Sequence, residues 1–140
     1  MAKKYEVTAG KRVVSAIMGW AARRGLGNFV VLTTRGRKSG EPRQVTVSPI
    51  TFDGVDYLVS PYGGSGWVLN VRADPHVSLT KGGTTREVEL VEVTGSRPEV
   101  VQAYYRREAF SRQFMDVPED PTVDDFAAVA ERFPVFEIPG

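Results

Sequence analysis

The sequence predicts one mainly β domain, in which about six mostly antiparallel strands form a small closed or partly closed barrel with helices packed outside. The chain has 140 residues, the length of one ordinary domain. Its 41% hydrophobic and 25% charged residues are typical of a globular protein. Hairpin-type turns follow one another along the chain, which favours antiparallel pairing because parallel strands need long crossovers.

The N-terminal part of the chain is basic. We expect residues 1–12, which are polar, to be a flexible segment, and residues 13–140 to form the domain. Apolar residues with helical spacing predict a helix over 13–24, which ends with two arginines before Gly25. This helix either packs on the core or presents its basic end to a membrane surface or a partner.

Six further segments have the β-branched or alternating composition of strands. They are residues 29–34, 42–50, 55–60, 76–81, 84–94 and 135–138. Asp53-Gly54 lies between the second and the third of these segments and is a hairpin signal.

Three helices are expected between and after these strands. A short helix over 67–73 stops before a proline. A helix from about 98 to 110 has Ser96 as its expected N-cap and Glu99 in a capping box. After an acidic loop, residues 123–132 predict a short helix with acidic residues in its first turn, which suits the helix dipole.

The net charge of +1 is a cancellation of two unequal halves. Residues 1–86 hold 13 Lys and Arg against 5 Asp and Glu, a balance of +8, whereas residues 87–140 hold 5 against 12, a balance of −7. This asymmetry predicts an anionic partner for the N-terminal part, with nucleic acid, membrane headgroups and a phosphorylated cofactor as the candidates.

Several kinds of site are excluded by composition. The chain has no cysteine and a single histidine, His76, so thiol catalysis, disulfides and multi-histidine metal sites are excluded, and we expect no metal. No apolar run reaches the roughly 18–20 residues of a membrane span, and we expect no signal peptide and a cytoplasmic location, with membrane association through the basic helix as a variant.

The first candidate site is the basic loop, TTRGRKSGEPR, from Thr33 to Arg43. Arginine and lysine bind phosphate, and glycine exposes the backbone N–H groups to it. The loop places the charges of Arg35, Arg37, Lys38 and Arg43 around Gly36, Gly40 and the hydroxyls of Thr33, Thr34 and Ser39. A solvated hairpin loop without a ligand is the alternative.

The second candidate is the segment SPYGGSGWVLN, from Ser60 to Asn70. Its glycines allow a flat ring to lie on the backbone, and the N-terminus of the following helix attracts anions. The candidates here are Tyr62, Gly63, Gly64, Trp67 and Asn70, with Arg72 adding positive charge. The alternative is a flexible connection in which Trp67 anchors the core, and for Trp67 itself we favour that role.

A third set is aromatic and lies near the C-terminus. Phe114 and Met115 are large apolar residues in an expected loop, so with Phe126 they are candidates for the wall of a substrate pocket. No nucleophile–base pair is present, so in an enzyme of this kind a cofactor would carry the chemistry. The acid in such an enzyme would be solvent, Ser60, Tyr62 or another hydroxyl of the pocket.

These motifs resemble the deazaflavin-dependent nitroreductase family, the A branch of the F420-dependent oxidoreductases of actinobacteria. The family pattern LTTxGRKSGxPR is matched by Leu32, Thr33, Thr34, Gly36, Arg37, Lys38, Ser39, Gly40, Pro42 and Arg43. The pattern W-x-x-N-x-x-A-x-P is matched by Trp67, Asn70, Ala73 and Pro75, and the C-terminal R-x-P-V-F by Arg132, Pro134, Val135 and Phe136.

The resemblance implies a split β-barrel that binds coenzyme F420, a deazaflavin with a phosphate and an oligoglutamate tail. Arg37, Lys38, Ser39 and Arg43 would hold the phosphate and the tail. The ring would lie near Tyr62, Gly63 and Gly64. The reduced cofactor would give a hydride to quinones, nitroaromatic compounds or the activated C=C bond of unsaturated lactones such as coumarins and aflatoxins.

This chain departs from the family's nitroimidazole-reducing members near the glycines. Those members often have lysine where Tyr62 stands, and a longer loop before the tryptophan, whereas here only Ser65 and Gly66 intervene. They also have a tyrosine-rich wall before the final strand, and no tyrosine occurs here between residues 120 and 126. The basic loop is intact.

Two other functions remain open from the sequence. One is an FMN-binding flavoprotein on the same barrel, and the other is a non-catalytic carrier or binding module for F420. We expect a small-molecule substrate, no nucleic acid, because the basic loop lacks interleaved aromatic residues, and a monomer or homodimer.

Overall fold

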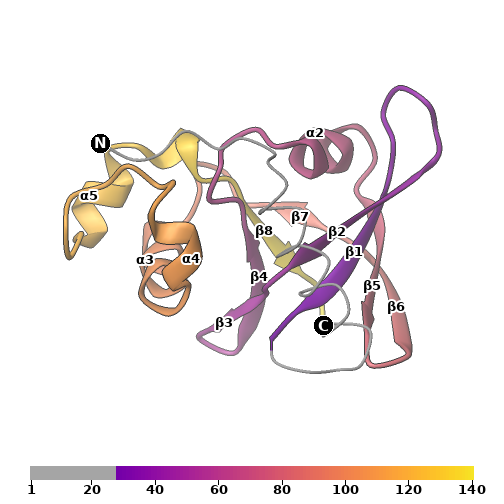
Figure 1. Ribbon diagram of the computed structural model, residues 1–140, viewed down its shortest axis with the longest axis horizontal. Coiled ribbons are helices and arrows are strands. Elements are labelled where there is room, and N and C mark those ends of the chain that lie inside the picture. Colours follow the sequence, from indigo (N-terminus) through magenta and orange to yellow (C-terminus); the bar gives the residue numbers. More distant parts are fainter. Residues whose placement is uncertain (1–27) are drawn as a thin grey trace.

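Two four-stranded antiparallel sheets form the centre of the computed structural model, which describes residues 28–140 (Figure 1). The predicted flexible segment over 1–12 and the predicted helix over 13–24 lie outside the described residues. The mainly β class with mostly antiparallel strands is confirmed.

The first sheet has the strand order β2-β1-β5-β6. Its strands are β1 (Val30–Arg35), β2 (Pro42–Val47), β5 (His76–Lys81) and β6 (Thr84–Glu89). The basic loop connects β1 to β2, and Thr34 pairs with Arg43 beside the loop. Gly82 and Gly83 join β5 to β6 with φ angles of 56° and 81°, values that favour glycine in a tight hairpin turn.

The second sheet has the strand order β3-β4-β8-β7. Its strands are β3 (Ile50–Phe52), β4 (Val55–Val59), β8 (Val135–Ile138) and β7 (Val91–Glu92). Asp53 and Gly54 form the turn between β3 and β4 with φ angles of 53° and 77°, so the predicted hairpin is confirmed.

Within residues 28–140, eight short strands replace the six that were expected, because two predicted strands change sheets along their length. The segment 42–50 divides into β2 and β3 at Ser48-Pro49, and 84–94 divides into β6 and β7 at Leu90. Proline lacks a backbone N–H and cannot continue a ladder, and Leu90 is buried in the core. No ladder joins the two sheets within residues 28–140, so the barrel is split rather than closed.

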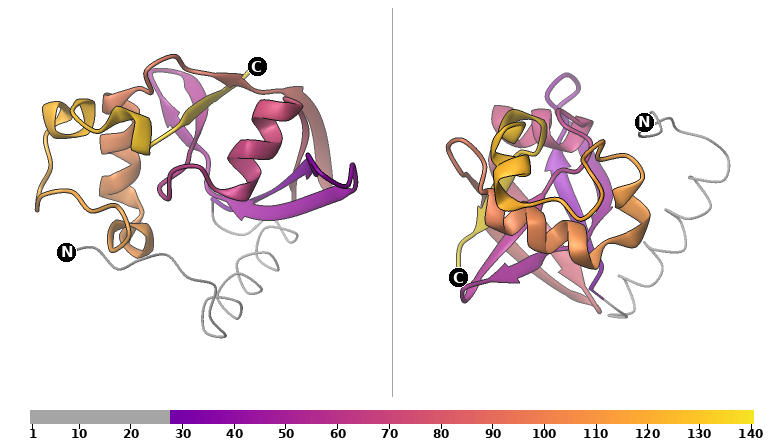
Figure 2. Two further views of the ribbon diagram at one scale, coloured as in Figure 1. Left: turned by 90° about the horizontal axis from the view of Figure 1, so that it is seen from above. Right: turned by 90° about the vertical axis from the view of Figure 1, so that its left-hand side faces the viewer.

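One hydrophobic core lies between the sheets and beneath helix α2 (Gly66–Ala73), which covers the end of the barrel (Figure 2). Its buried residues are Val30, Leu32, Leu58, Val68, Val71, Val77, Leu79, Leu90, Phe136 and Ile138. The predicted helix over 67–73 is therefore confirmed, and its buried face is Val68, Asn70 and Val71.

A second core lies on the other face of the second sheet, under α3 (Pro98–Arg107) and α5 (Val123–Ala127). Its buried residues are Ile50, Tyr57, Val59, Val100, Val101, Tyr104, Met115, Phe126, Phe133 and Val135. The central strands β4 and β8 are thus covered on both faces, which explains why their sequences are almost continuously apolar.

The C-terminal helices differ in detail from the prediction. α3 ends at Arg107 and a separate turn, α4 (Ala109–Arg112), follows it. The N-cap of α3 is Arg97 rather than Ser96, because the Ser96 hydroxyl donates to the backbone oxygen of Phe133 at 2.6 Å. The predicted Ser96 capping box was wrong.

The last predicted helix, over 123–132, is likewise divided. It forms α5 and a 3-10 turn, η1 (Ala130–Arg132). α5 begins with a capping box in which the Thr122 hydroxyl accepts from the Asp125 N–H at 3.1 Å, and the Asp125 carboxylate accepts from the Thr122 N–H at 2.8 Å. None of the helices within residues 28–140 is long and apolar enough to cross a bilayer.

Candidate functional site

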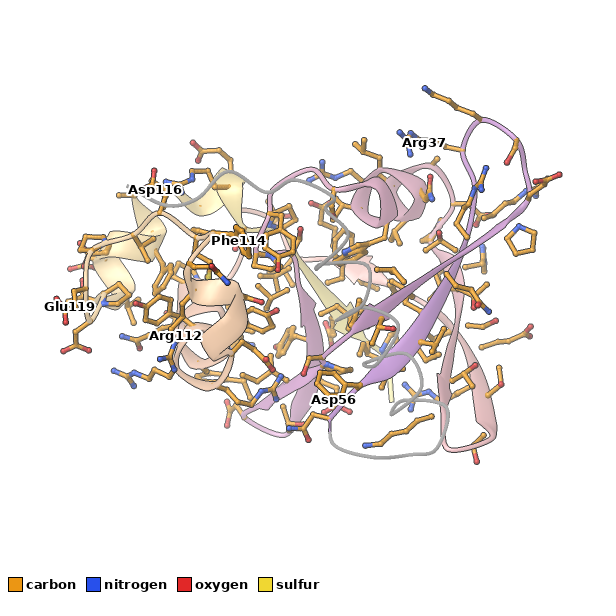
Figure 3. The ribbon with its side chains drawn as sticks, viewed as in Figure 1. Arg37, Asp56, Arg112, Phe114, Asp116 and Glu119 are labelled. Atoms are coloured by element: carbon orange, nitrogen blue, oxygen red, sulfur yellow. The ribbon has the colours of Figure 1, made fainter. Side chains whose placement is uncertain are left out.

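A cavity of about 310 Å³ lies where the basic loop meets the N-terminus of α2. It is lined by Thr34, Gly36, Arg37, Lys38, Ser39, Arg43, Gln44, Val45, Gly66, Trp67 and Asn70. The structure therefore brings together two segments that the sequence analysis singled out separately. Figure 3 shows Arg37 reaching from the loop between β1 and β2 to the side of α2.

The backbone of the basic loop is closed by hydrogen bonds that need glycine. The Gly36 N–H donates to the Glu41 oxygen and the Gly40 N–H to the Gly36 oxygen, each at 2.8 Å. A Cβ on Gly36 would lie 2.9 Å from Ser39 Oγ and 3.0 Å from the Glu41 oxygen, and Gly40 has a φ of +73°. The loop is therefore compact because side chains are absent at these two positions.

A chain of hydrogen bonds ties the loop to α2. The buried Asn70 Oδ1 accepts from the Arg37 backbone N–H at 3.2 Å and from Arg37 Nη1 at 2.9 Å. Asn70 Nδ2 donates to Thr34 Oγ1 at 3.1 Å, and Thr34 Oγ1 donates to the Arg43 oxygen at 3.5 Å. Arg37 also donates to the Gly66 oxygen at 3.5 Å.

The cavity is electropositive. Arg37, Lys38 and Arg43 are the charged residues that line it, and none of its lining residues is acidic. The first turn of α2 carries no acidic residue, and its N-cap makes no side-chain hydrogen bond to the helix N–H groups. An anion in the cavity would therefore interact with three cations and with the positive end of a helix dipole.

A second cavity of about 460 Å³ is less suited to an anion. It contains Thr34, which also lines the first cavity, but its charged lining residues are Arg35, His76, Glu87 and Glu89. Cations and carboxylates there offset one another. The first cavity is therefore the better anion site of the two.

The glycine loop, residues 60–65 between β4 and α2, lies beside the first cavity. Gly66, the first residue of α2, follows this loop directly and lines the cavity. Tyr62, Gly63 and Gly64 are not among the lining residues. Ser60 is fully buried, and its hydroxyl donates to the Gly63 oxygen at 2.7 Å. Gly63 has a φ of +72°, a conformation that favours glycine. In this arrangement the Ser60 hydroxyl orders the loop.

Trp67 belongs both to the cavity and to the core. It lines the cavity, while its ring packs against Phe136 with 5.4 Å between the centroids. The structural and the functional interpretation of Trp67 are therefore compatible, because the residue contacts both the cavity and the core.

Arg72 does not join the cavity. Its guanidinium makes two hydrogen bonds to the Glu92 carboxylate on β7, at 3.0 and 2.7 Å, and it is not a lining residue. Glu92 also raises the pKa of Arg72, chiefly through these hydrogen bonds. The expectation that Arg72 adds positive charge to the site overlooked this partner, which lies on a distant strand.

The three predicted wall residues divide into two groups. Met115 and Phe126 are fully buried in the second core, so their side chains form protein interior and no pocket wall. Phe114 is half-buried, and its ring meets that of Tyr62 edge-on. Phe114 alone of the three remains a candidate for substrate contact.

Sequence reasoning missed two kinds of residue at the site. Gln44 and Val45 on β2 also line the cavity. Val45 lies two positions after Arg43, so the two-residue period of a strand predicts that Arg43 and Val45 point to the same side. Arg132 donates to the backbone oxygens of Met115 and Asp116 and so fixes the turn that holds Phe114. No local signal in the sequence indicates that contact.

Comparison with known proteins shows the family of this chain. The model of a family described as F420H(2)-dependent quinone reductase matches residues 4–116, which include the basic loop, the glycine loop and α2. Among solved structures, an F420-H2-dependent reductase, FDR-A, is 25% identical with a TM-score of 0.51, over 80% of this chain and 94% of that one. No curated protein matches the chain in sequence.

More distant structures share the fold alone. A NimC/NimA family protein of Clostridium acetobutylicum is 16% identical with a TM-score of 0.57, over 94% of this chain and 88% of its own. A putative pyridoxamine 5′-phosphate oxidase of Listeria innocua is 13% identical with a TM-score of 0.54, over 94% and 93%. The family match covers most of the chain: the protein belongs to the F420H2-dependent quinone reductases, oxidoreductases in which reduced coenzyme F420 is the hydride donor.

Proposed function

We propose that this protein reduces quinones with F420H2 and that the cavity between the basic loop and α2 holds the anionic part of the cofactor. The observation that carries the proposal is the charge of the cavity, three cations with no acidic lining residue. We extend the proposal to other electron-poor substrates, namely unsaturated lactones such as coumarins and aflatoxins, and nitroaromatic compounds.

The donor set fits the cofactor. A phosphate and a row of glutamates require several hydrogen-bond donors of positive charge. Lys38 and Arg43 have exposed side chains at the cavity, and Arg37 joins them from the same loop. Gly66 would add its backbone N–H at the start of α2, where a Cβ would meet nothing within 4 Å.

The glycine loop supplies the surface for a flat ring in this proposal. Gly64 has no atom within 4 Å of the position that a Cβ would take, so a planar group has room to approach the backbone. Ser60 holds the loop through Gly63, and Tyr62 and Phe114 form an aromatic face beside it. When bound, reduced F420 would supply the hydride that, together with one proton, converts a quinone to a quinol.

Among the candidate hydroxyls, we favour Tyr62 over Ser60 for contact with the substrate. Ser60 is fully buried and donates its hydrogen to Gly63, whereas Tyr62 is half-buried. Proton donation by Ser60 would break a bond that orders the glycine loop. Solvent remains the alternative proton source.

The test is a spectral titration with F420, followed by F420H2 oxidation with a panel of menaquinone analogues, coumarins and nitroaromatics. We expect binding that weakens with salt, and turnover with quinones. Lys38→Ala and Arg43→Ala should each lower the affinity for F420 on the order of tenfold or more, because a charge-assisted contact contributes about 1.5–3 kcal/mol. Lys81→Ala is the matched control, because Lys81 is a cation at the C-terminal end of β5 and does not line the cavity.

Three outcomes would contradict the proposal. A folded sample that does not bind F420 refutes the cofactor site. A yellow protein that retains FMN on purification supports the flavoprotein alternative. Binding of F420 without turnover on any substrate of the panel supports a carrier rather than an enzyme.

A further inference from the structure

The side-chain amide of Asn70 makes three hydrogen bonds within the protein, although the residue lines a cavity. Asn70 is only 5% exposed. Its Oδ1 accepts two hydrogen bonds from Arg37, at 3.2 Å from the backbone N–H and 2.9 Å from Nη1. An amide oxygen has two lone pairs, so both are used within the protein.

The nitrogen of the same amide reaches the backbone of Arg43 through Thr34. Asn70 Nδ2 donates to Thr34 Oγ1 at 3.1 Å, and Thr34 is 2% exposed. The Thr34 hydroxyl in turn donates to the backbone oxygen of Arg43 at 3.5 Å, and the two residues are paired between β1 and β2. One amide is thereby hydrogen-bonded to Arg37 and, through Thr34, to the backbone of Arg43.

This arrangement leaves little of Asn70 for a ligand. Its acceptor capacity is filled by Arg37, and one of its two N–H groups is donated to Thr34. In the described part of the chain no buried side-chain nitrogen or oxygen lacks a partner. Removing the amide would therefore take away the donor to Thr34 Oγ1 and both Asn70 contacts of Arg37, which leaves the Arg37 guanidinium, within residues 28–140, only its 3.5 Å bond to the Gly66 oxygen. It would remove no positive charge.

We propose that Asn70 is a positioning residue for the anion site, which holds Arg37 directly and Arg43 through Thr34, and that it does not itself bind the cofactor. This inference rests on the proposed function of the cavity. It assigns Lys38, Arg37 and Arg43 to direct contact with the anion, and Thr34 and Asn70 to the support behind them.

A double-mutant cycle tests the inference. The dissociation constant of oxidised F420 is measured for the wild type, Asn70→Ala, Arg37→Ala and the double variant. A residue that acts through another loses its effect when that other residue is gone. We expect Asn70→Ala to weaken binding roughly tenfold, by analogy with hydrogen bonds to charged groups, and the loss in the double variant to fall well short of the product of the two single losses. A loss equal to that product overturns the inference.

Steady-state kinetics provide a second readout. Misplaced arginines should raise the KM for F420H2 of Asn70→Ala while kcat at saturating F420H2 stays within about twofold of the wild type, because the effect is on ground-state binding. A fall in kcat with an unchanged KM would contradict a positioning role. Circular dichroism and thermal unfolding of each variant show whether it is folded.

Thr34 offers a pair of variants that keeps the test decisive if Asn70→Ala does not fold. Thr34→Ser retains the hydroxyl and should bind F420 within about twofold of the wild type, whereas Thr34→Val loses it and should bind several-fold more weakly. The cycle is then repeated with Thr34→Val in place of Asn70→Ala and Arg43→Ala in place of Arg37→Ala, because Thr34 contacts Arg43. Equal affinities of the two Thr34 variants overturn the inference. Failure of the wild type to bind F420 would refute the proposed function instead.

Discussion

The ring of Tyr62 meets the ring of Phe114 edge-on, with 5.5 Å between the centroids and 81° between the planes. This contact joins the glycine loop to the turn after α4, two segments that are far apart in the sequence. Arg132 fixes the same turn through the backbone oxygens of Met115 and Asp116, and its own backbone oxygen lies 3.7 Å from the position of a Cβ on Gly63. The aromatic pair is thus supported from both sides.

Phe114→Ala is expected to weaken substrate binding more than cofactor binding. An edge-to-face aromatic pair contributes about 0.5–1.5 kcal/mol beyond its buried area, and without Phe114 the Tyr62 ring loses that support. The KM for a quinone should rise by roughly twofold to tenfold, while the dissociation constant of F420 stays near the wild-type value. Leu69→Ala, which removes an exposed apolar residue from α2, is the control. An unchanged KM together with weaker F420 binding would contradict this prediction.

Gly36→Ala is expected to open the basic loop. The added Cβ would lie 2.9 Å from Ser39 Oγ and 3.0 Å from the Glu41 oxygen, closer than side-chain atoms normally approach. Relief of such a contact costs about 1–3 kcal/mol, so the thermal midpoint should fall and F420 affinity with it. Gly66→Ala is the control for stability, because its Cβ meets nothing within 4 Å and lies at the start of a helix. Equal thermal midpoints for the two variants would refute the argument.

Local signals predicted the parts of the fold that depend on neighbours in the sequence. The Asp53-Gly54 hairpin and helix α2 follow from turn chemistry and from the proline after the helix. The division at Leu90 was not predictable in this way, because β propensity continues through that residue, whereas the division at Ser48-Pro49 does have a local signal in the proline. A strand changes sheets where tertiary packing stabilises the change, and at Leu90 the stabilisation comes from burial of its side chain between the sheets.

The site shows the same limit. The composition of the basic loop indicates an anion, and the cavity brings that loop to α2, which the sequence indicated only through the family resemblance. Which cations remain available to bind an anion depends on partners that are remote in sequence. The Glu92 carboxylate binds the Arg72 guanidinium, and Asn70 Oδ1 accepts a hydrogen bond from Arg37 Nη1. Likewise, an apolar residue in a loop, such as Met115, is exposed or buried according to what covers it, which a sequence pattern does not specify.

Ser60→Ala is expected to act on stability and on the glycine loop rather than on proton transfer. The substitution removes the donor to the Gly63 oxygen at 2.7 Å in a fully buried position. Loss of such a bond costs about 1–3 kcal/mol, so the free energy of unfolding should fall by that amount. The pH dependence of kcat should keep the wild-type shape. A changed pH profile with unchanged stability would instead make Ser60 the proton donor.

Arg72→Ala is expected to leave F420 binding within about twofold of the wild type, because the pair with Glu92 already neutralises its charge outside the cavity. The Arg72 and Glu92 side chains are 44% and 36% exposed, so the loss of stability should be small, about 0–1 kcal/mol. Titration of F420 into the variant checks this. A loss of affinity as large as that of Arg43→Ala would restore Arg72 to the cofactor site.

His76 is expected to make stability depend on pH. Its Nδ1 lies 3.0 Å from the Asp74 carboxylate and its Nε2 lies 3.6 Å from Glu89. The hydrogen bond to Asp74 is the main cause that raises the pKa of His76 above 6.5, and the bond to His76 is the main cause that lowers the pKa of Asp74 below 3.8. The stabilisation from His76 is complete below its unfolded pKa and is lost as the pH rises through its folded pKa.

The carboxylate acts in the opposite direction, since the stabilisation from Asp74 is present above its unfolded pKa and is lost as the pH falls through its folded pKa. The interaction should therefore stabilise the fold most between about pH 4 and pH 6.5. We expect the difference in thermal midpoint between the wild type and His76→Gln to be largest near pH 5 and to shrink toward about pH 8.5. It should be modest, because the histidine side chain is exposed. A difference that grows with pH would show that His76 stabilises the fold in its neutral form.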